Sequence, residues 1–262
     1  MDEYVHLIQY SISPKGPHSL KIDFASLEHP IFALRGGDKN IRIYERKTKK
    51  SMVRITVKPG ADGCATVHDK DLWIYCMQHL AAAKNIGASI SRTVRFSAYD
   101  FLTSTGRGTS GRAYLEMNQM LGRLAGTRID TNIETAGRRE CGFFGLLDSA
   151  RTVERGNTTA VEVTLPEWLF RAVNAYEILT IDPSYFSMRS PIDRRIYELG
   201  RKHCGAQKKF PMTLRVVHEK SGSRGSLKEF RRAFKDLVAN REIPGYLISH
   251  DQTKDMAIWR PR

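Results

Sequence analysis

The histidines and cysteines are the residues best suited to metal or acid–base chemistry, and their spacing argues against both. The eight histidines never form an H-x-H, H-x-x-x-H or H-E-x-x-H group, the spacings that place two imidazoles on one ion. The four cysteines never form a C-x-x-C pair, so we expect reduced thiols. A nickase would need a metal-binding histidine pair near a tyrosine, and an ATP-driven helicase would need a G-x-x-x-x-G-K-[ST] loop. The sequence contains neither. We therefore expect no catalytic residues, no metal, no cofactor and no enzymatic activity.

A glycine-rich hexapeptide matches a phosphate-binding fingerprint but lies in the wrong context. Residues 106–111 read Gly-Arg-Gly-Thr-Ser-Gly and match G-x-G-x-x-G. A dinucleotide-binding turn joins a buried strand directly to a helix within a βαβ unit, whereas here a short helix from Ser97 is expected to precede the glycines. We interpret the segment as a flexible turn whose backbone amides could contact a DNA phosphate.

The segment after Ser226 carries the clearest pattern for binding a polyanion. Ser226 and Glu229 are spaced as a capping box, which predicts the start of a helix. Four apolar residues share one face of that helix: Leu227, Phe230, Phe234 and Leu237. Three basic residues project from the opposite face: Lys228, Arg232 and Lys235. Because the major groove of DNA admits one helix, and Lys or Arg binds phosphates or guanine acceptors there, we predict a DNA-reading helix.

A solvated amphipathic helix would show the same pattern, so the surroundings of this segment matter. The chain has 42 Lys and Arg against 28 Asp and Glu, a net charge of +14. Residues 189–262 hold 18 of the basic and 8 of the acidic residues, so most of the positive field lies in the last third of the chain. A turn precedes the helix and a hairpin pattern follows it. Together these features favour double-stranded DNA as the partner.

A second candidate helix spans residues 110–124 and has fewer charges but more groups suited to reading bases. Its apolar face is formed by Tyr114, Met117, Leu121 and Leu124. Its Ser, Arg and Gln side chains can donate to or accept from base edges, and Glu116 could read cytosine or repel phosphate. A purely structural helix is the competing interpretation. The residues predicted to contact DNA in the whole chain are Arg107, Ser110, Arg112, Gln119, Arg123, Arg194, Arg195, Ser221, Ser223, Arg224, Lys228, Arg231, Arg232, Lys235 and Lys254.

The elements expected around the candidate helix at 110–124 are in the order typical of a winged helix-turn-helix domain. The elements predicted before it are strands at 41–44 and 53–57, a helix at 70–84, a strand at 93–96 and a short helix from Ser97. Those predicted after it are strands within 128–133, 142–153 and 160–164. A winged helix-turn-helix domain has this order: a short helix, a turn, a long helix and then strands.

The C-terminal part of the chain predicts the same order again. Residues 182–187 are interpreted as a linker, and Ser190-Pro191 opens a helix that reaches Gly205. The elements predicted next are a short helix at 211–219, a turn at 221–223, the helix from Ser226 and strands at 246–249 and 256–259. We predict an α+β protein of two tandem winged helix-turn-helix domains, residues 1–182 with added β-strands and residues 183–262.

The N-terminal sequence predicts a cytoplasmic protein. Residues 1–13 are acidic where a signal peptide is basic. No apolar run approaches the roughly 18 residues that a membrane-spanning helix requires. We therefore expect no membrane partner.

Several segments resemble bacterial plasmid replication initiators of the replication initiator protein A family. The C-terminal resemblance lies in residues 193–205 (DRRIYELGRKHCG), in Lys220-Ser221-Gly222-Ser223 and in Phe230-Arg231-Arg232. Supporting segments are residues 27–32, 65–76 and 121–127. The resemblance extends over about residues 20–245.

This resemblance implies a tandem winged-helix initiator that binds repeated sites, or iterons, at a plasmid origin. Such an initiator opens the adjacent DNA and brings in the host replication initiator and the replicative helicase. It also implies a homodimer that forms through the N-terminal domain, and repression of the protein's own promoter. All of this work is done by binding energy and involves no bond chemistry.

Other functions share some of these features. A transcriptional repressor without a replication role uses the same winged helices, and only origin-dependent replication separates the two. An enzyme that nicks or primes DNA would show metal-dependent cleavage or synthesis. An RNA-binding or structural protein is the least favoured, because the aromatic residues do not cluster with the basic ones as stacking platforms do.

Overall fold

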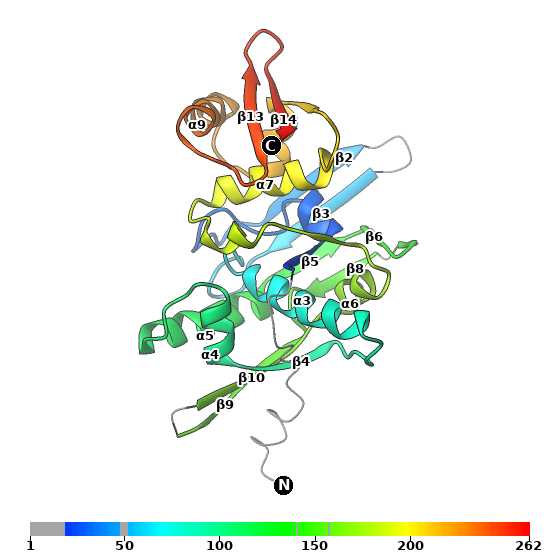
Figure 1. Ribbon diagram of the computed structural model, residues 1–262, viewed down its shortest axis with the longest axis vertical. Coiled ribbons are helices and arrows are strands. Elements are labelled where there is room, and N and C mark those ends of the chain that lie inside the picture. The colour runs from blue at the N-terminus through cyan, green and yellow to red at the C-terminus, as the bar shows by residue number, and fades with distance from the viewer. Residues whose placement is uncertain (1–18, 48–51, 140, 157) are drawn as a thin grey trace.

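The computed structural model describes residues 19–47, 52–139, 141–156 and 158–262, and shows a mixed arrangement of helices and small antiparallel sheets (Figure 1). The N-terminal sequence on which the signal-peptide argument depends, residues 1–13, lies outside these ranges. Among the described residues, every helix is too short or too polar to cross a bilayer.

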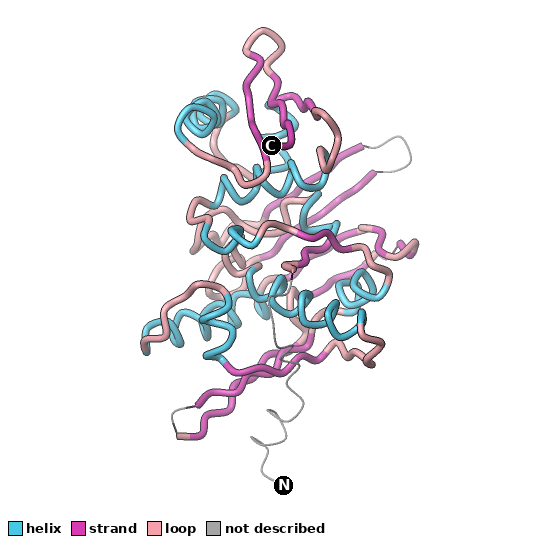
Figure 2. The backbone as a smooth tube through the Cα atoms, viewed as in Figure 1, coloured by secondary structure: helices cyan, strands magenta, loops and turns pink. Residues whose placement is uncertain are grey.

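The first half of the chain contains six elements that together form one unit. They are α3 (Asp71–Asn85), β4 (Thr93–Ser97), α4 (Ala98–Ser104), α5 (Gly111–Gly126), β9 (Ser149–Arg155) and β10 (Thr158–Thr164). The strands form a three-stranded antiparallel sheet in the order β4-β10-β9, so the first strand pairs with the last. The β9–β10 hairpin projects at the lower end of the molecule (Figure 2).

The second half repeats this order of elements. They are α7 (Pro191–His203), β12 (Phe210–Thr213), α8 (Leu214–Ser221), α9 (Leu227–Asn240), β13 (Tyr246–Asp251) and β14 (Met256–Pro261). The sheet order is β12-β14-β13, so again the first strand pairs with the last. Both halves are thus built as helix, strand, helix, helix and a terminal hairpin.

A second, four-stranded sheet belongs to the first half and has the order β2-β3-β5-β8. Its strands are β2 (Arg42–Lys47), β3 (Met52–Lys58), β5 (Arg128–Thr131) and β8 (Gly142–Gly145). Ile55, Val57 and Ile129 on its inner face are buried in the core, whereas Ile43 and Phe143 on its outer face are exposed. The strands predicted at 41–44 and 53–57 are therefore confirmed.

Shorter elements complete the first half and link it to the second. They are β1 (Lys21–Asp23), α2 (Phe24–Glu28), the hairpin of β6 (Glu134–Thr135) and β7 (Arg138–Arg139), α6 (Glu167–Asn174), β11 (Ile178–Thr180) and the 3₁₀ helix η1 (Pro183–Ser187). Strand β1 pairs with β11, so the start of the described chain lies beside the segment that leads into the second half.

The helix predicted at 211–219 is wrong in its first part. Residues 210–213 form strand β12, in which Phe210 faces Trp259 of β14. Pro211 is compatible with this strand because β12 lies at the edge of its sheet, where a missing N–H breaks no ladder. Helix α8 starts only at Leu214, after Thr213, whose side chain accepts a hydrogen bond from the backbone N–H of Val216.

The linker predicted at 182–187 is also a different structure from the one expected. The segment folds as η1, with the Asp182 side chain accepting from the backbone N–H of Ser184 at 2.8 Å. Tyr185 is fully buried, and the backbone N–H of Asp182 donates to the hydroxyl of Tyr197 at 2.7 Å. The two halves consequently share one continuous hydrophobic core.

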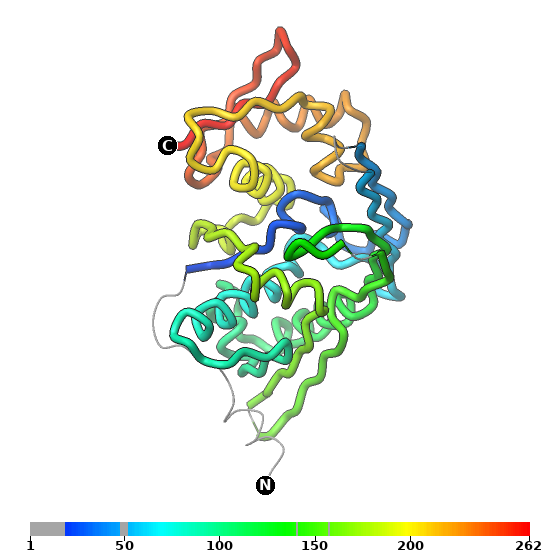
Figure 3. The backbone as a smooth tube through the Cα atoms, turned by 90° about the vertical axis from the view of Figure 1, so that its right-hand side faces the viewer, coloured from blue at the N-terminus to red at the C-terminus, as the bar shows by residue number. Residues whose placement is uncertain are grey.

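Helix α7 occupies the junction of the two halves. It packs against α2 of the first half and α8 of the second (Figure 3). Trp259 of β14 is fully buried against it and donates from its indole N–H to the carbonyl of Ile196 at 3.1 Å. Gly200 allows this approach, since a Cβ there would lie 2.6 Å from Cδ1 of Trp259.

Replacing Gly200 with alanine should therefore destabilise the protein by about 1–3 kcal/mol, because the added methyl group overpacks the indole site. The measurement is urea unfolding of Gly200→Ala. The matched control is Gly111→Ala, where no heavy atom lies within 4 Å of the new Cβ and helix propensity favours alanine. Equal stability of Gly200→Ala and the unaltered protein would contradict the close packing described here.

Candidate nucleic-acid interface

Helix α9 presents one buried and one basic face, as its sequence predicts. Ser226 caps its N-terminus: the Ser226 hydroxyl accepts from the backbone N–H of Glu229, and the Glu229 carboxylate accepts from the backbone N–H of Ser226 at 2.7 Å. Phe230, Phe234 and Leu237 are buried. The side chains predicted to read DNA from this helix are all exposed: Lys228, Arg232 and Lys235.

Arg231, at the flank of the basic face, is engaged within the protein. Its guanidinium donates to both carboxylate oxygens of Asp255, at 2.7–3.1 Å. This contact raises the pKa of Arg231 and lowers that of Asp255. Arg231 thereby ties α9 to the β13–β14 hairpin, while Lys254, in the turn of that hairpin, is exposed.

The turn between α8 and α9 contributes less to the surface than its sequence predicts. Ser221 is fully buried and its hydroxyl donates to the carbonyl of His218 at 2.7 Å, so the prediction that it contacts DNA is wrong in this structure. Ser223 is half-buried. Arg224 pairs with Asp38 of the first half at 2.6 Å, although more than half of its side chain remains exposed.

Helix α5 exposes most of the residues predicted to read bases. Ser110 occupies the N-cap position without a side-chain cap hydrogen bond and is exposed. Gln119 is exposed, as is Arg112, which pairs with Glu116 one turn along at 2.9 Å. Leu115 lies between them in sequence and is also exposed, and an apolar side chain here could contact a thymine methyl group.

Two arginines, one in α5 and one in the turn before it, are paired with carboxylates that the sequence pattern did not indicate. Arg123 forms two parallel hydrogen bonds with Asp69, at 2.8 and 2.9 Å, and this contact raises the pKa of Arg123. Arg107, in the turn before α5, donates to Asp71 at 2.8 Å. Both arginines are only partly exposed. The signal that could have identified them is the run of three charges at 69–71, at the start of the largely buried helix α3.

Arg194 and Arg195 lie in the interior, and the prediction that they contact DNA is wrong in this structure. Only 2% of Arg194 and 1% of Arg195 is exposed. Arg194 binds Asp71 and the carbonyl of Met188, and Arg195 binds Glu198 and the carbonyls of Ser26 and Lys220. A buried guanidinium requires such partners, and α7 supplies both arginines to the junction of the halves.

The two candidate helices lie on the same side of the molecule in one view. Helices α5 and α9 are both on the left in Figure 1, α5 in the lower and α9 in the upper part. Each is the third helix of its six-element unit, and the hairpin of that unit, β9–β10 or β13–β14, lies at one end of the molecule. The arrangement could present two helices to the same side of a DNA duplex.

The described residues offer no alternative metal chemistry. Within the ranges that the structure describes, no group of three or more His, Cys, Asp or Glu side chains is arranged to hold a metal ion. Cys64, Cys76 and Cys204 are buried free thiols, and burial raises the pKa of Cys76. Cys141 is a free thiol on the surface.

Comparison with known proteins found one similar sequence and similar solved structures. The chain is 42% identical over 250 residues to a protein of Wigglesworthia glossinidia brevipalpis that is named as a replication protein; the match covers 93% of this chain and 90% of the relative. Two crystal structures of domains 2 and 3 of RctB have a similar fold at 10% identity, with TM-scores of 0.65 and 0.59. They cover 91% and 90% of this chain and 98% and 96% of the respective RctB chains.

The family resemblance noted in the sequence is confirmed over nearly the same residues. Residues 21–248 match the family described as replication initiator protein A, which is most of the chain and includes both halves. The match begins at β1 and ends within β13, so it contains α5, α7 and α9. The chain belongs to the replication initiator protein A family.

Proposed function

We propose that this protein starts DNA replication by binding specific repeated sites in double-stranded DNA at an origin. Residues 1–182 and 183–262 act as two winged helix-turn-helix modules, each with its own reading helix. The observation that carries this proposal is the repeat of one six-element order in both halves, in which the third helix of each unit, α5 or α9, has a polar, exposed face. Membership of a replication initiator family supports the replication role.

Helix α9 reads one major groove in this proposal. Arg232 lies in the middle of its exposed face, where a guanidinium can bind both the O6 and N7 atoms of guanine. Lys228 and Lys235, one turn away on either side, bind phosphates. Lys254 at the tip of the β13–β14 hairpin reaches the backbone beside them. Arg231 holds the hairpin against α9 through Asp255 and so fixes the angle between the helix and the hairpin.

Helix α5 reads a second groove on the same side of the duplex. Its exposed face is nearly neutral, because Arg112 is paired with Glu116. Gln119 can bind adenine through two hydrogen bonds. The part of the DNA site that α5 contacts is the second sub-site, and the part that α9 contacts is the first. Specificity at the second sub-site therefore depends more on hydrogen bonds and contact with methyl groups than on charge. The basic C-terminal module provides most of the electrostatic attraction.

The remaining steps of initiation follow from the family. The protein acts through binding energy and not as an enzyme, in the cytoplasm, and it opens the duplex beside its sites. The host replication initiator and replicative helicase are the partners that the family implies. A winged-helix repressor without a replication role is the competing function, and a replication assay distinguishes it.

The first experiment is a titration of the protein on DNA from around its own gene and on scrambled duplex, at two salt concentrations. Specific binding to short repeats, with nanomolar affinity, is expected. A plasmid that carries those repeats and the gene should then replicate without another origin. Equal, salt-sensitive binding to every duplex would overturn the proposal, whereas specific binding without replication would favour the repressor.

Arg232→Ala should weaken binding to the cognate site by about 5- to 150-fold and relax the base preference at one position, because it removes a bidentate base contact. Anisotropy titrations on the cognate site and its single-base variants measure both effects. Arg262→Ala, an exposed arginine at the C-terminus, is the control for loss of one positive charge.

Lys228→Ala and Lys235→Ala should instead weaken all sequences equally and lower the slope of log K against log salt by roughly one unit each. If Arg232→Ala bound the cognate site as tightly as the unaltered protein, α9 would not be the reading helix. Gln119→Ala tests α5 in the same way at the second sub-site.

The outer face of the β2-β3-β5-β8 sheet is proposed as the surface of a homodimer. It exposes Ile43 and Phe143, which are 60% and 66% exposed, and an apolar surface of this kind favours contact with another protein. Ile43→Asp should shift sedimentation from dimer towards monomer in the absence of DNA. Ile86→Asp, an exposed apolar position at the end of α3, is the control. A monomer at all micromolar concentrations of unaltered protein would contradict the dimer.

A further inference from the structure

Three consecutive charged residues at the start of α3 are buried. Asp69, Lys70 and Asp71 are only 3%, 1% and 2% exposed. Burial of a charge is costly unless an opposite charge and hydrogen bonds compensate for it, so each of these residues requires a partner. Their four charged partners come from helix α5, the turn before it and helix α7.

Asp69 holds the end of helix α5. Its two carboxylate oxygens accept from Nε and Nη2 of Arg123, in the last turn of α5, at 2.9 and 2.8 Å. Asp69 also accepts from the backbone N–H of Thr66 at 2.8 Å, which fixes the carboxylate itself. A bidentate pair of this kind restrains orientation as well as distance.

Asp71 holds the start of α5 and the first helix of the other half. Arg107, in the turn between α4 and α5, donates to one of its carboxylate oxygens at 2.8 Å. Arg194 of α7 donates to the other oxygen. One carboxylate thus links the turn before the N-terminal reading helix to the C-terminal module.

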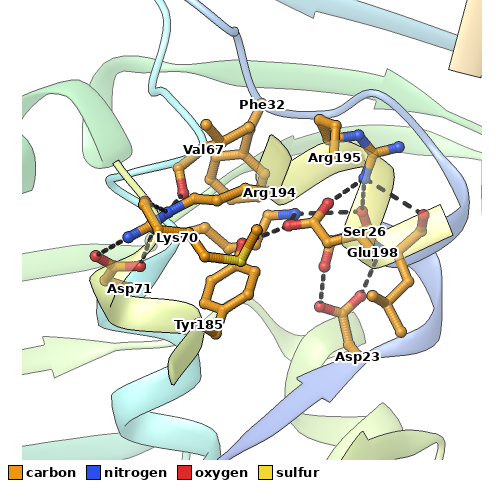
Figure 4. A network of polar contacts seen from close by, with 12 residues as sticks. Asp23, Ser26, Phe32, Val67, Lys70, Asp71, Tyr185, Arg194, Arg195 and Glu198 are labelled. Atoms are coloured by element: carbon orange, nitrogen blue, oxygen red, sulfur yellow. Dashed lines mark hydrogen bonds and ion pairs between the residues drawn. The ribbon is translucent and has the colours of Figure 1, made fainter. Parts of the chain in front are cut away.

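Lys70 makes the second link to α7 (Figure 4). Its ammonium group donates to Glu198 at 2.8 Å, and Glu198 also accepts from Arg195 and from the hydroxyl of Tyr185. The positive charges of Lys70 and Arg195 outweigh burial and lower the pKa of Glu198. Arg195 in turn donates to the carbonyl of Lys220 near the end of α8, at 2.7 Å. The chain of contacts therefore runs from α5 to the helix before α9.

We propose that Asp69, Lys70 and Asp71 are positioning residues that fix the N-terminal reading helix α5 relative to the C-terminal reading helix α9. Because of this coupling, the protein accepts only one spacing between its two sub-sites on DNA. The proposal rests on the proposed function, in which both helices read DNA. Arg107 and Arg123 act here by holding α5 in place, which differs from the direct DNA contact expected from the sequence.

Two variants break separate links without leaving a buried charge unpaired. Asp69→Asn keeps the size of the side chain and leaves Arg123 partly exposed, where water can solvate it. Lys70→Met removes a buried charge, while Glu198 keeps its contacts with Arg195 and Tyr185. Glu116→Gln is the control, because it breaks the exposed Arg112–Glu116 pair on the same helix.

The first test measures geometry without DNA. Nitroxide labels are attached to cysteines introduced by Leu115→Cys in α5 and Lys235→Cys in α9, both exposed sites, in a Cys141→Ser background. Pulsed electron-spin resonance should give one narrow distance distribution for the otherwise unaltered protein and for Glu116→Gln. At least a twofold broadening, or a shifted maximum, is expected for Asp69→Asn and Lys70→Met. Unchanged distributions in both variants would overturn the proposal, and circular dichroism verifies that each variant is folded.

The second test uses DNA whose two sub-sites are separated by five additional base pairs, about half a helical turn. The unaltered protein should lose at least tenfold in affinity on this DNA, and Asp69→Asn less than threefold. If the unaltered protein bound the original and the lengthened DNA with equal affinity, fixed spacing would be refuted, but the proposed specific binding would not. Absence of specific binding to any duplex would refute the proposed function, and the distance measurement would still decide the positioning role.

Discussion

The structure depends on pairing the charges that the junction of its two halves buries. Helix α7 brings Arg194, Arg195 and Glu198 into the core. The first half supplies Asp71 to Arg194 and Lys70 to Glu198, and Arg195 pairs with Glu198 within α7. Removing one member of a buried pair typically costs 3–5 kcal/mol, whereas the intact pair adds little net stability. The network is therefore better understood as a device for specifying one arrangement. Apolar packing would tolerate sliding of the halves, but a set of fixed donors and acceptors does not.

The elements that the sequence predicts well are those whose signals are local. The capping box at Ser226 and the periodicity of α9 depend on residues within a few turns, and both predictions are confirmed. The helix predicted at 211–219 includes strand β12, whose partner β14 follows more than forty residues later and gives no local signal. The 3₁₀ helix at 183–187 was missed for the same reason, since Tyr185 is fixed by Glu198.

The same distinction between local and distant signals explains which predicted site residues are exposed and which are buried. A helical wheel separates Lys228 and Arg232 from the apolar face of α9, because exposure there follows from position on one helix. It cannot identify Arg194 or Arg195 as buried, since α7 is covered on more than one side by elements distant in the sequence. Residues 193–205, which carry the family resemblance, were therefore predicted to contact DNA, although their Arg194 and Arg195 form buried ion pairs within the protein.

This sorting of the arginines changes the electrostatic argument for DNA binding. The 42 Lys and Arg residues include guanidinium groups that pair with carboxylates within the protein, such as Arg194 with Asp71 and Arg123 with Asp69. Each such pair adds nothing to the net charge of +14 and offers no cation to DNA. Counterion release requires cations that reach phosphates, so the number of exposed, uncommitted cations near α9 sets the salt dependence more directly than net charge. The near-neutral face of α5 then contributes mainly selectivity. A protein built in this way gains affinity from one module and discrimination from the other, provided that the junction holds both helices in register.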